Sequence, residues 1–201
     1  MDQPDSVTIS VTPTIAAKLL IPLLGKLHTS LPDIKLHTLA TEAVSDFDRD
    51  QVDIALRLTK KSFPENLEAQ LLFRQELIVV ASPFLVQDLT LPLKPEQLIS
   101  MPLLHDAHDN WPKFLNTNVK LSGLVFSQTT LELDAALSGQ GIALACRDFV
   151  DEEIKSGKLV QVVSEIMTIE PSYYLVRKKS SHSNTTVNKI WQWCIEYLGT
   201  N

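Results

Sequence analysis

Short β-rich runs alternate with helical runs along most of this 201-residue chain. The first series is a strand at 7–11, a helix at 15–30, a strand at 34–38, a short helix at 45–50 and a strand at 52–56. Pro22 lies inside the first helix and removes one hydrogen bond there, so we expect a kink. Alternation of this kind predicts an α/β fold with parallel strands joined by right-handed crossovers.

The pattern restarts after Glu76 and continues to the end of the chain. Strands are expected at 77–81, 102–105, 124–126, 142–145 and 173–176, with helical segments at 95–100, 111–115, 130–138 and 148–155. Gly139 and Gly157 should end the last two of these helices. A final amphipathic helix begins near Ser183 or Asn184, and its apolar stripe consists of Val187, Ile190, Trp191, Cys194, Ile195 and Leu198.

Two doubly wound halves fit this order better than one large sheet. Residues 1–6 would form a tail, residues 7–74 with 172–201 a first subdomain, and residues 75–171 a second. The chain would then cross between the halves near Arg74–Glu76 and again near Glu170–Ser172. The stretches 59–66 and 106–111 are the expected functional loops.

Composition and charge narrow the class of protein. The chain is 44% hydrophobic and 21% charged, which is ordinary for a soluble globular protein. The net charge of −6 and the absence of a basic run longer than Lys178-Lys179 argue against direct contact with nucleic acid. Residues 1–5 resemble neither a signal peptide nor a membrane anchor, and no stretch approaches the roughly 20 apolar residues of a membrane span. Cys146 and Cys194 are expected to be buried free thiols in a reducing cytosol.

Two strand–helix junctions carry clusters of hydroxyl side chains. The strand at 7–11 runs into Thr12 and Thr14, and the strand at 124–126 runs into Ser127 and Thr129. Free N–H groups and hydroxyls at a helix N-terminus bind small anions, so the junctions suggest two half-sites that face each other across a cleft. The alternative is helix capping, because Thr129 with Glu132 three residues later forms a capping-box pattern. The sequence leaves both interpretations open.

The segment that begins at His105 is a second candidate. His105 and Asp106 follow a predicted strand at its carboxyl end, where α/β sheets bind ligands. His105 and His108 suggest a metal site only superficially, because zinc needs three or four converging ligands and no further ligand motif lies nearby. We therefore expect a loop that lines the cleft and no metal.

Arg57 and the Tyr173-Tyr174 pair complete the set of candidates. Arg57 ends a buried-looking strand and would either bind a carboxylate ligand with its guanidinium fork or form a structural ion pair with Asp53 or Asp50. One of the two tyrosines would face the core and the other the cleft, since neighbours alternate on a strand. No set of residues assembles a nucleophile, a base and an orienting group, so the sequence does not predict an enzyme.

Several short motifs occur in an order and spacing that cover nearly the whole chain: Thr14 before Leu19-Leu20-Ile21-Pro22-Leu23, then Leu31-Pro32-Asp33-Ile34-Lys35-Leu36, Val52-Asp53-Ile54-Ala55-Leu56-Arg57, Leu77-Ile78-Val79-Val80-Ala81-Ser82-Pro83, Ala135-Ala136 before Gly139-Gln140-Gly141-Ile142-Ala143-Leu144, and Ser156-Gly157-Lys158-Leu159-Val160. In these motifs the chain resembles the effector-binding domain of LysR-type transcriptional regulators. The segment 104–115 is similar to the branch of glycine-cleavage and β-lactamase regulators.

The resemblance implies a periplasmic-binding-protein-like fold with a small-molecule effector in a cleft between two α/β halves. It also implies a homodimer or higher homo-oligomer, a cytoplasmic location without membrane contact, and DNA binding only through an N-terminal winged helix-turn-helix domain that this chain lacks. No cofactor is implied. By position, Thr14 and Thr129 would match the family's cleft residues, with Tyr173 beside them.

The sequence therefore favours a ligand-sensing regulatory domain, and the alternative is a solute-binding protein of a transport system. An enzyme on the same scaffold is the least favoured interpretation. The expected ligand-binding residues are Thr12, Thr14, Arg57, His105, Asp106, Ser127, Thr129 and Tyr173.

Overall fold

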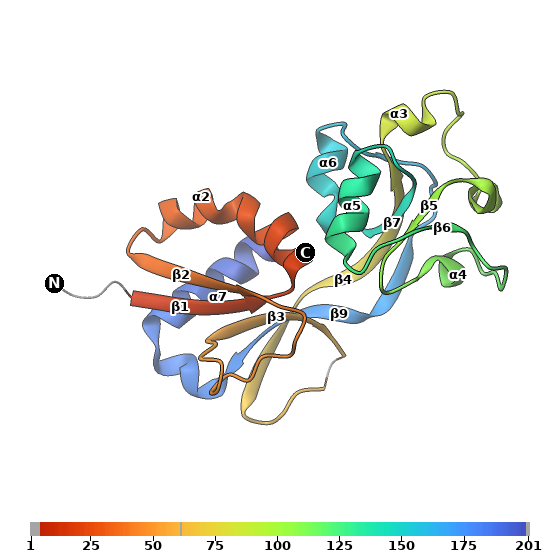
Figure 1. Cartoon of the computed structure of the whole chain (residues 1–201). Helices are drawn as coiled ribbons and strands as arrows, with labels where there is room; N and C mark the ends of the chain where they lie inside the picture. Colours follow the sequence, from red (N-terminus) through yellow and green to blue (C-terminus); the bar gives the residue numbers. More distant parts are fainter. Residues whose placement is uncertain (1–4, 61, 200–201) are drawn as a thin grey trace. The chain divides into compact units, whose positions relative to one another are not determined.

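The computed structural model describes residues 5–60 and 62–199, and strands and helices alternate along it (Figure 1). The chain divides into two compact units: Met1–Arg74 with Glu170–Asn201 form unit 1, and Gln75–Ile169 form unit 2. Two long strands, β4 (Leu67–Ala81) and β9 (Met167–Lys178), each contribute residues to both units. The predicted α/β class is confirmed.

Unit 1 is built on a mixed sheet. Strand β1 (Asp5–Val11) lies between β2 (Ile34–Ala40) and β3 (Ile54–Thr59) and is parallel to both, so the predicted parallel series is confirmed. Strand β9 then pairs with β3 in the antiparallel sense, which the sequence did not indicate. Side chains from the sheet form the core of the unit: Val7, Ile9, Val11, Ile54, Leu56 and Leu175 are buried.

The helix predicted at 15–30 is present, but it is not a uniform α-helix. It consists of α1 (Pro13–Ile15), a π-helical turn η1 (Ala16–Leu20) and α2 (Ile21–Ser30). The N–H group of Ile21 donates to the carbonyl of Ala16, five residues back, as a π turn requires. Since Pro22 has no N–H group to donate, the irregular segment lies directly before this proline.

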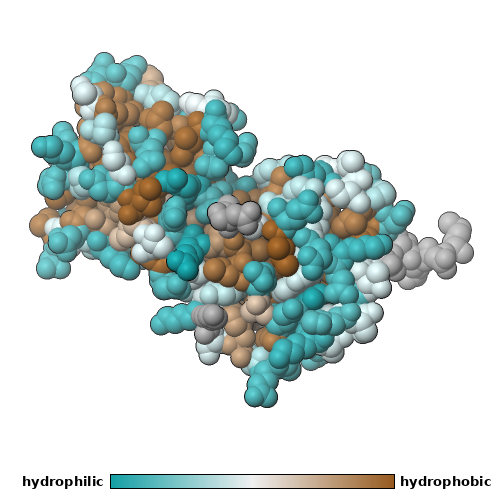
Figure 2. Space-filling view, turned by 180° about the vertical axis from the view of Figure 1, so that it is seen from behind, coloured by the Kyte–Doolittle hydropathy of each residue, from teal (hydrophilic) through white to brown (hydrophobic). Residues whose placement is uncertain are grey.

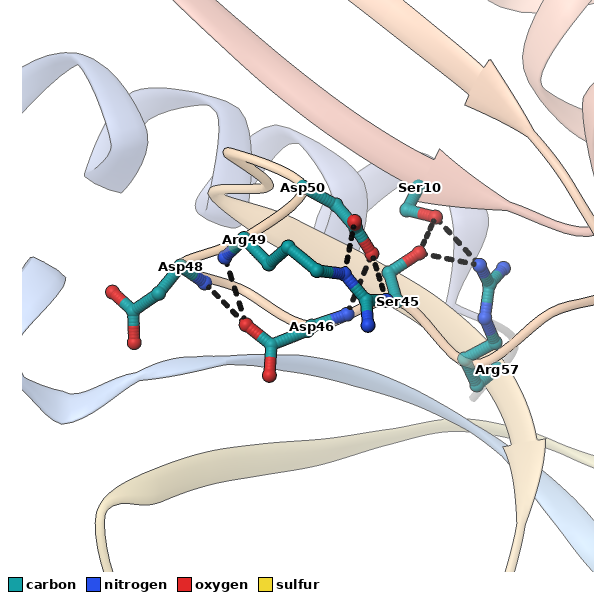
Figure 3. Close-up of polar contacts among 7 residues, drawn as sticks. All are labelled: Ser10, Ser45, Asp46, Asp48, Arg49, Asp50 and Arg57. Carbon is teal, nitrogen blue, oxygen red and sulfur yellow. Dashed lines mark hydrogen bonds and ion pairs between the residues drawn. The ribbon is translucent and has the colours of Figure 1, made fainter.

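The short helix predicted at 45–50 is wrong, because a turn stands there (Figure 3). The Oδ1 atom of Asp46 accepts hydrogen bonds from the N–H groups of Asp48 and Arg49, and Asp50 accepts one from the N–H of Asp46. Arg49 also pairs with Asp50. Aspartate side chains that bind nearby N–H groups compete with helix formation, and the same donors lower the pKa of Asp46.

Helix α7 (Thr185–Leu198) confirms the predicted C-terminal helix. Its N-cap is Asn184, whose Oδ1 accepts hydrogen bonds from the N–H groups of Thr186 and Val187 at 3.0 and 3.1 Å. The helix packs against β1. It also lies beside α2, where the Nζ atom of Lys26 lies 4.7 Å from the ring centroid of Tyr197. Its buried residues are Val187, Ile190, Trp191, Trp193, Cys194 and Leu198. Trp193 thus joins the predicted stripe, whereas Ile195, which was predicted to belong to it, is only half-buried.

A buried arginine ties α7 to the sheet of unit 1. The Nε atom of Arg177 donates to Glu68 at 2.6 Å, and one terminal nitrogen donates to Asn188 at 2.5 Å. The guanidinium carbon lies 4.3 Å from the ring centroid of Trp191. His182 reaches the same carboxylate of Glu68 at 2.7 Å, and these contacts lower the pKa of Glu68 against the effect of burial.

Unit 2 contains two groups of strands. The segment of β4 in this unit pairs in the antiparallel sense with β7 (Ala143–Cys146) and β8 (Val160–Gln161), while β5 (Leu103–His105) and β6 (Gly123–Val125) form a parallel pair. Its helical elements are α3 (Pro83–Val86), η2 (Pro95–Ser100), α4 (Trp111–Phe114), α5 (Thr129–Leu137), η3 (Arg147–Phe149) and α6 (Asp151–Lys155).

Several boundaries in the second half differ from those predicted. Strand β4 starts at Leu67, ten residues before the predicted strand at 77–81, and the helix predicted at 148–155 is divided into η3 and α6. Gly139 and Gly157 follow α5 and α6 with φ of +71° and +72°, which confirms them as helix terminators.

The thiols and the surface agree with a globular chain. Cys146 and Cys194 are free and buried, as predicted.

Among residues 5–60 and 62–199, no helix is long and apolar enough to cross a membrane. Figure 2 shows apolar surface scattered among polar residues on each unit; Ile21 on α2 and Val125 on β6 are 58% and 76% exposed.

Candidate functional site

The first strand–helix junction divides its two threonines between different roles. Thr12 is the N-cap of α1, and its Oγ1 accepts a long 3.4 Å hydrogen bond from the N–H of Ile15. Pro13 occupies the first helical position, where its missing N–H costs nothing. Thr14 lies in the first turn and is 6% exposed. Capping therefore accounts for Thr12, and the ligand hypothesis at this junction depends on Thr14.

Arg57 on β3 lies near this junction and is held by serine hydroxyls (Figure 3). One terminal nitrogen donates to the Oγ of Ser10 at 2.5 Å, to the Oγ of Ser45 at 3.2 Å and to the carbonyl of Ala43 at 3.3 Å. The two serine Oγ atoms lie 2.6 Å apart. These contacts place the guanidinium beside the end of β1, where Thr12 and Thr14 follow.

The predicted ion pair of Arg57 with Asp53 or Asp50 is wrong. Asp53 accepts a hydrogen bond from the N–H of Thr8 instead, and Asp50 pairs with Arg49. Across the described part of the chain, no carboxylate forms an ion pair with Arg57, and its buried Nε has no hydrogen-bond partner. Burial therefore lowers the pKa of Arg57, although it stays charged at neutral pH. The charge of Glu42 opposes this effect of burial, but Glu42 forms no ion pair with Arg57, so the half-buried guanidinium is a suitable partner for an anionic ligand.

The second junction does not form the predicted capping box. The N-cap of α5 is Gln128, which makes no side-chain cap, and Thr129 is the first helical residue. The hydroxyl of Thr129 donates to Oδ2 of Asp106 at 2.6 Å, and Ser127 is exposed. The structure thus brings together two of the predicted site residues, Thr129 and Asp106, which are 23 positions apart.

Glu132 does not have the role that the capping-box pattern suggested. It does not reach back to the helix N-terminus but is buried inside unit 2, only 1% exposed, and its Oε2 atom has no hydrogen-bond partner. Burial and the nearby charge of Asp106 raise the pKa of Glu132 to about 9, against a hydrogen bond from the backbone of Leu144. The carboxyl is therefore neutral at pH 7. Its apolar neighbours in sequence, Leu131 and Leu133, were the only hint of burial.

His105 lies in the same region of unit 2. It is 7% exposed; its Nδ1 lies 3.1 Å from a carboxylate oxygen of Asp109, and its Nε2 is buried without a partner. The other oxygen of Asp106 accepts a hydrogen bond from the N–H of His108 at 2.9 Å. Within the described ranges, no group of three or more histidine, cysteine or acidic residues could hold a metal ion.

Tyr173 and Tyr174 are both buried in unit 1. The ring of Tyr173 stacks on Phe73 with 4.6 Å between centroids, and Tyr174 meets Phe63 edge-on at 5.2 Å. Burial therefore does not separate a core-facing from a ligand-facing tyrosine. A groove of about 410 Å³ also lies on unit 1, between the end of α2 and the face of α7 that carries Asn188 and Trp193, and none of the predicted site residues lines it.

The sequence matches the profile of the family described as LysR substrate binding domain over residues 3–199. The chain belongs to this family. The resemblance found in the sequence motifs is thus confirmed, and with it the interpretation as an effector-binding domain of LysR-type transcriptional regulators.

Curated relatives agree with this assignment. The glycine cleavage system transcriptional activator of Escherichia coli (strain K12) is 30% identical over 197 residues, which cover 94% of this chain and 64% of that protein. The HTH-type transcriptional regulator BlaA of Proteus vulgaris is 27% identical over 195 residues, covering 94% and 65%. The chain thus spans about 64% of the length of the first of these relatives. Both are transcriptional regulators, so the alternative of a solute-binding protein of a transport system is not supported.

Solved structures show the same fold. The effector domain of the transcriptional regulator AmpR of Pseudomonas aeruginosa superposes with a TM-score of 0.78 at 23% identity, covering 96% of this chain and 94% of that one. The regulatory domain of CrgA from Neisseria meningitidis gives a TM-score of 0.76 at 24% identity, covering 98% and 100%. The periplasmic-binding-protein-like fold implied by the sequence motifs is therefore confirmed.

Proposed function

We propose that this chain is the ligand-sensing part of a cytoplasmic transcription factor, in which a small molecule controls an attached DNA-binding domain. Unit 1 and unit 2 would be the two subdomains of the sensor. The relatives support the proposal, because they are DNA-binding regulators and extend beyond the segment matched here. In thermodynamic terms, the effector must bind one state of the sensor more tightly than the other to act as a switch.

We infer that the effector carries a carboxylate and that Arg57 of unit 1 binds it. Arg57 carries the inference: it is a half-buried guanidinium held by two serine hydroxyls, with no carboxylate partner among the described residues. Thr14 of the same unit would supply a neutral hydrogen-bonding contact, and Thr129 and Asp106 of unit 2 are further candidates for ligand contact. Thr12, His105, Ser127 and Tyr173 remain second-rank candidates for ligand contact.

Calorimetry on single variants tests this site. Amino acids, peptides and aromatic acids are first screened by thermal shift, and the best stabiliser is then titrated into Thr14→Ala, Thr129→Ala and Arg57→Gln. Since a hydrogen bond to a charged group contributes about 1.5–3 kcal/mol, Arg57→Gln should weaken binding by roughly 10- to 100-fold. Thr29→Ala, on the exposed side of α2, is the matched control and should bind as the wild type does. Unchanged affinity in all three site variants would refute the assignment.

We further propose that the sensor acts as a homodimer or higher homo-oligomer, as the family resemblance implies. Sedimentation equilibrium of the 201-residue chain measures this state directly. A monomer at all concentrations up to about 100 μM would place dimerisation elsewhere in the longer protein, since specific interfaces hold partners well below that range.

A further inference from the structure

The carboxylate of Asp106 is the accessible polar group of the second junction. It follows β5 and is half-buried, so it contacts solvent on one side. On the other side, Oδ2 accepts the hydroxyl of Thr129 at 2.6 Å and Oδ1 accepts the N–H of His108 at 2.9 Å. Each carboxylate oxygen has further lone pairs, so Asp106 can accept additional hydrogen bonds from a ligand.

Glu132 lies near Asp106, close enough for the charge of Asp106 to disfavour ionisation of the Glu132 carboxyl. It is 1% exposed, and its Oε2 atom is buried without a partner. A buried polar atom without a hydrogen bond costs about 1–3 kcal/mol. The packing of the surrounding fold, and not the hydrogen bonding of Oε2, therefore keeps this side chain buried. Unsatisfied buried polar atoms are few in native proteins, so each of them calls for an explanation.

The carboxyl of Glu132 is neutral at pH 7, so the negative charge of this pair is that of Asp106. His105 on β5 is paired through Nδ1 with Asp109, and Leu144 on β7 offers Glu132 only its backbone. At the end of β7, burial raises the pKa of the Cys146 thiol to about 12, so it is neutral. Within residues 75–169, all of them described, no lysine or arginine forms an ion pair with Asp106 or Glu132. The charge of Asp106 is therefore not balanced by an ion-paired cation within this unit.

We propose that Asp106, with Thr129 hydrogen-bonded to it and Glu132 buried nearby, is a subsite for a primary ammonium group of the effector. The inference rests on the proposed ligand-sensing function and extends it. Asp106 accepts N–H hydrogen bonds from the ammonium group, and Glu132 acts through Asp106 as a positioning residue. An anion, which the hydroxyl pattern of this junction suggested, would instead meet the Asp106 carboxylate and be repelled.

The proposal defines a chemical class of effector. The effector therefore belongs to the compounds that carry a primary ammonium group, as amino acids and peptides do. It also predicts a proton exchange. An opposite charge within about 4–6 Å favours the ionised carboxyl, so Glu132 releases its proton to solvent when the ammonium group binds.

Nuclear magnetic resonance of the whole 201-residue chain with ¹³C-labelled glutamate tests the proposal. The pH midpoint of Glu132 is measured with methylammonium chloride and, at equal ionic strength, with sodium chloride or tetramethylammonium chloride. Methylammonium should bind saturably and lower the midpoint by about 1–3 pH units, because it is a cation that donates N–H hydrogen bonds. Tetramethylammonium has the same charge but no N–H donor and should act as sodium does. Exposed Glu165 supplies an internal control, whose resonance should not respond to methylammonium.

Two variants separate the contact from the proton exchange. Asp106→Asn should abolish the response to methylammonium, whereas Glu132→Gln should still show a saturable shift of the Thr129 amide resonance without any proton release. A response to methylammonium no larger than that to sodium, or one that persists in Asp106→Asn, overturns the ammonium subsite. Such a failure leaves ligand sensing intact if Arg57→Gln still weakens the binding of carboxylates, so the two proposals fall separately.

Discussion

Glu132 makes the stability of the folded chain depend on pH. Its pKa is about 9 in the folded protein and 4.5 in an unfolded chain, because burial and the charge of Asp106 disfavour the ionised form. Below pH 4.5 the carboxyl is protonated in both states and has no effect. Between pH 4.5 and 9 only the unfolded chain ionises, so the free energy of unfolding falls as the pH rises, and above pH 9 the loss is complete.

Replacing Glu132 with glutamine removes this dependence while keeping the shape of the side chain. Each pH unit between the two pKa values corresponds to about 1.4 kcal/mol, so the wild type should lose about 4 kcal/mol relative to Glu132→Gln from pH 5 to pH 8. The amide introduces an additional buried donor with a fixed cost of about 1–3 kcal/mol. That cost is independent of pH and cancels when the two pH values are compared.

Urea unfolding followed by circular dichroism at pH 5, 6, 7 and 8 measures the difference. Glu165→Gln on the surface is the matched control and should parallel the wild type at every pH. If Glu132→Gln also parallels the wild type within about 1 kcal/mol across this range, then Glu132 is ionised in the folded protein. Glu132 would then not be a neutral, buried group near Asp106.

Three further predictions concern stability and reactivity. Replacing Arg177 with methionine should lower the free energy of unfolding, measured in urea, by about 2–3 kcal/mol, because Glu68 and Asn188 lose the hydrogen bonds that the buried guanidinium donates to them. Gly139→Ala should lower the free energy of unfolding by about 1 kcal/mol, because the φ of Gly139 is +71°. Gly25→Ala within α2 should raise it by about 0.5–1 kcal/mol, because a Cβ there meets open space. Urea unfolding of the two variants should therefore show changes of opposite sign. Cys146 and Cys194, whose pKa values burial raises to about 12, should react with a thiol reagent only as fast as the protein unfolds, and rapid labelling of the folded chain at pH 8 would contradict this.

Local patterns in the sequence were sufficient for many elements. The apolar stripe and the Asn184 cap of α7 lie within a few residues of one another, so the helix could be predicted from that segment alone. The same is true of the helix ends at Gly139 and Gly157, where a positive φ requires glycine. The family could also be identified, because its motifs recur in a characteristic order.

Other elements depend on competition or pairing that a local pattern does not show. The segment 45–50 has helical spacing, but its aspartates bind nearby N–H groups and stabilise a turn. The first ten residues of β4 include exposed positions and lack a continuous apolar run, so only pairing with neighbouring strands makes them a strand.

The sequence by itself determined the α/β order, the family and the residue types at the two junctions. Only the tertiary structure decided what those residues do, because each decisive contact joins positions far apart in the chain: Arg57 meets Ser10 across 47 positions, and Thr129 meets Asp106 across 23. A Thr-x-x-Glu pattern is a capping box only if the glutamate stays at the surface. At the second junction Thr129 donates to the Asp106 carboxylate and Glu132 is buried nearby, and no local pattern reports either feature.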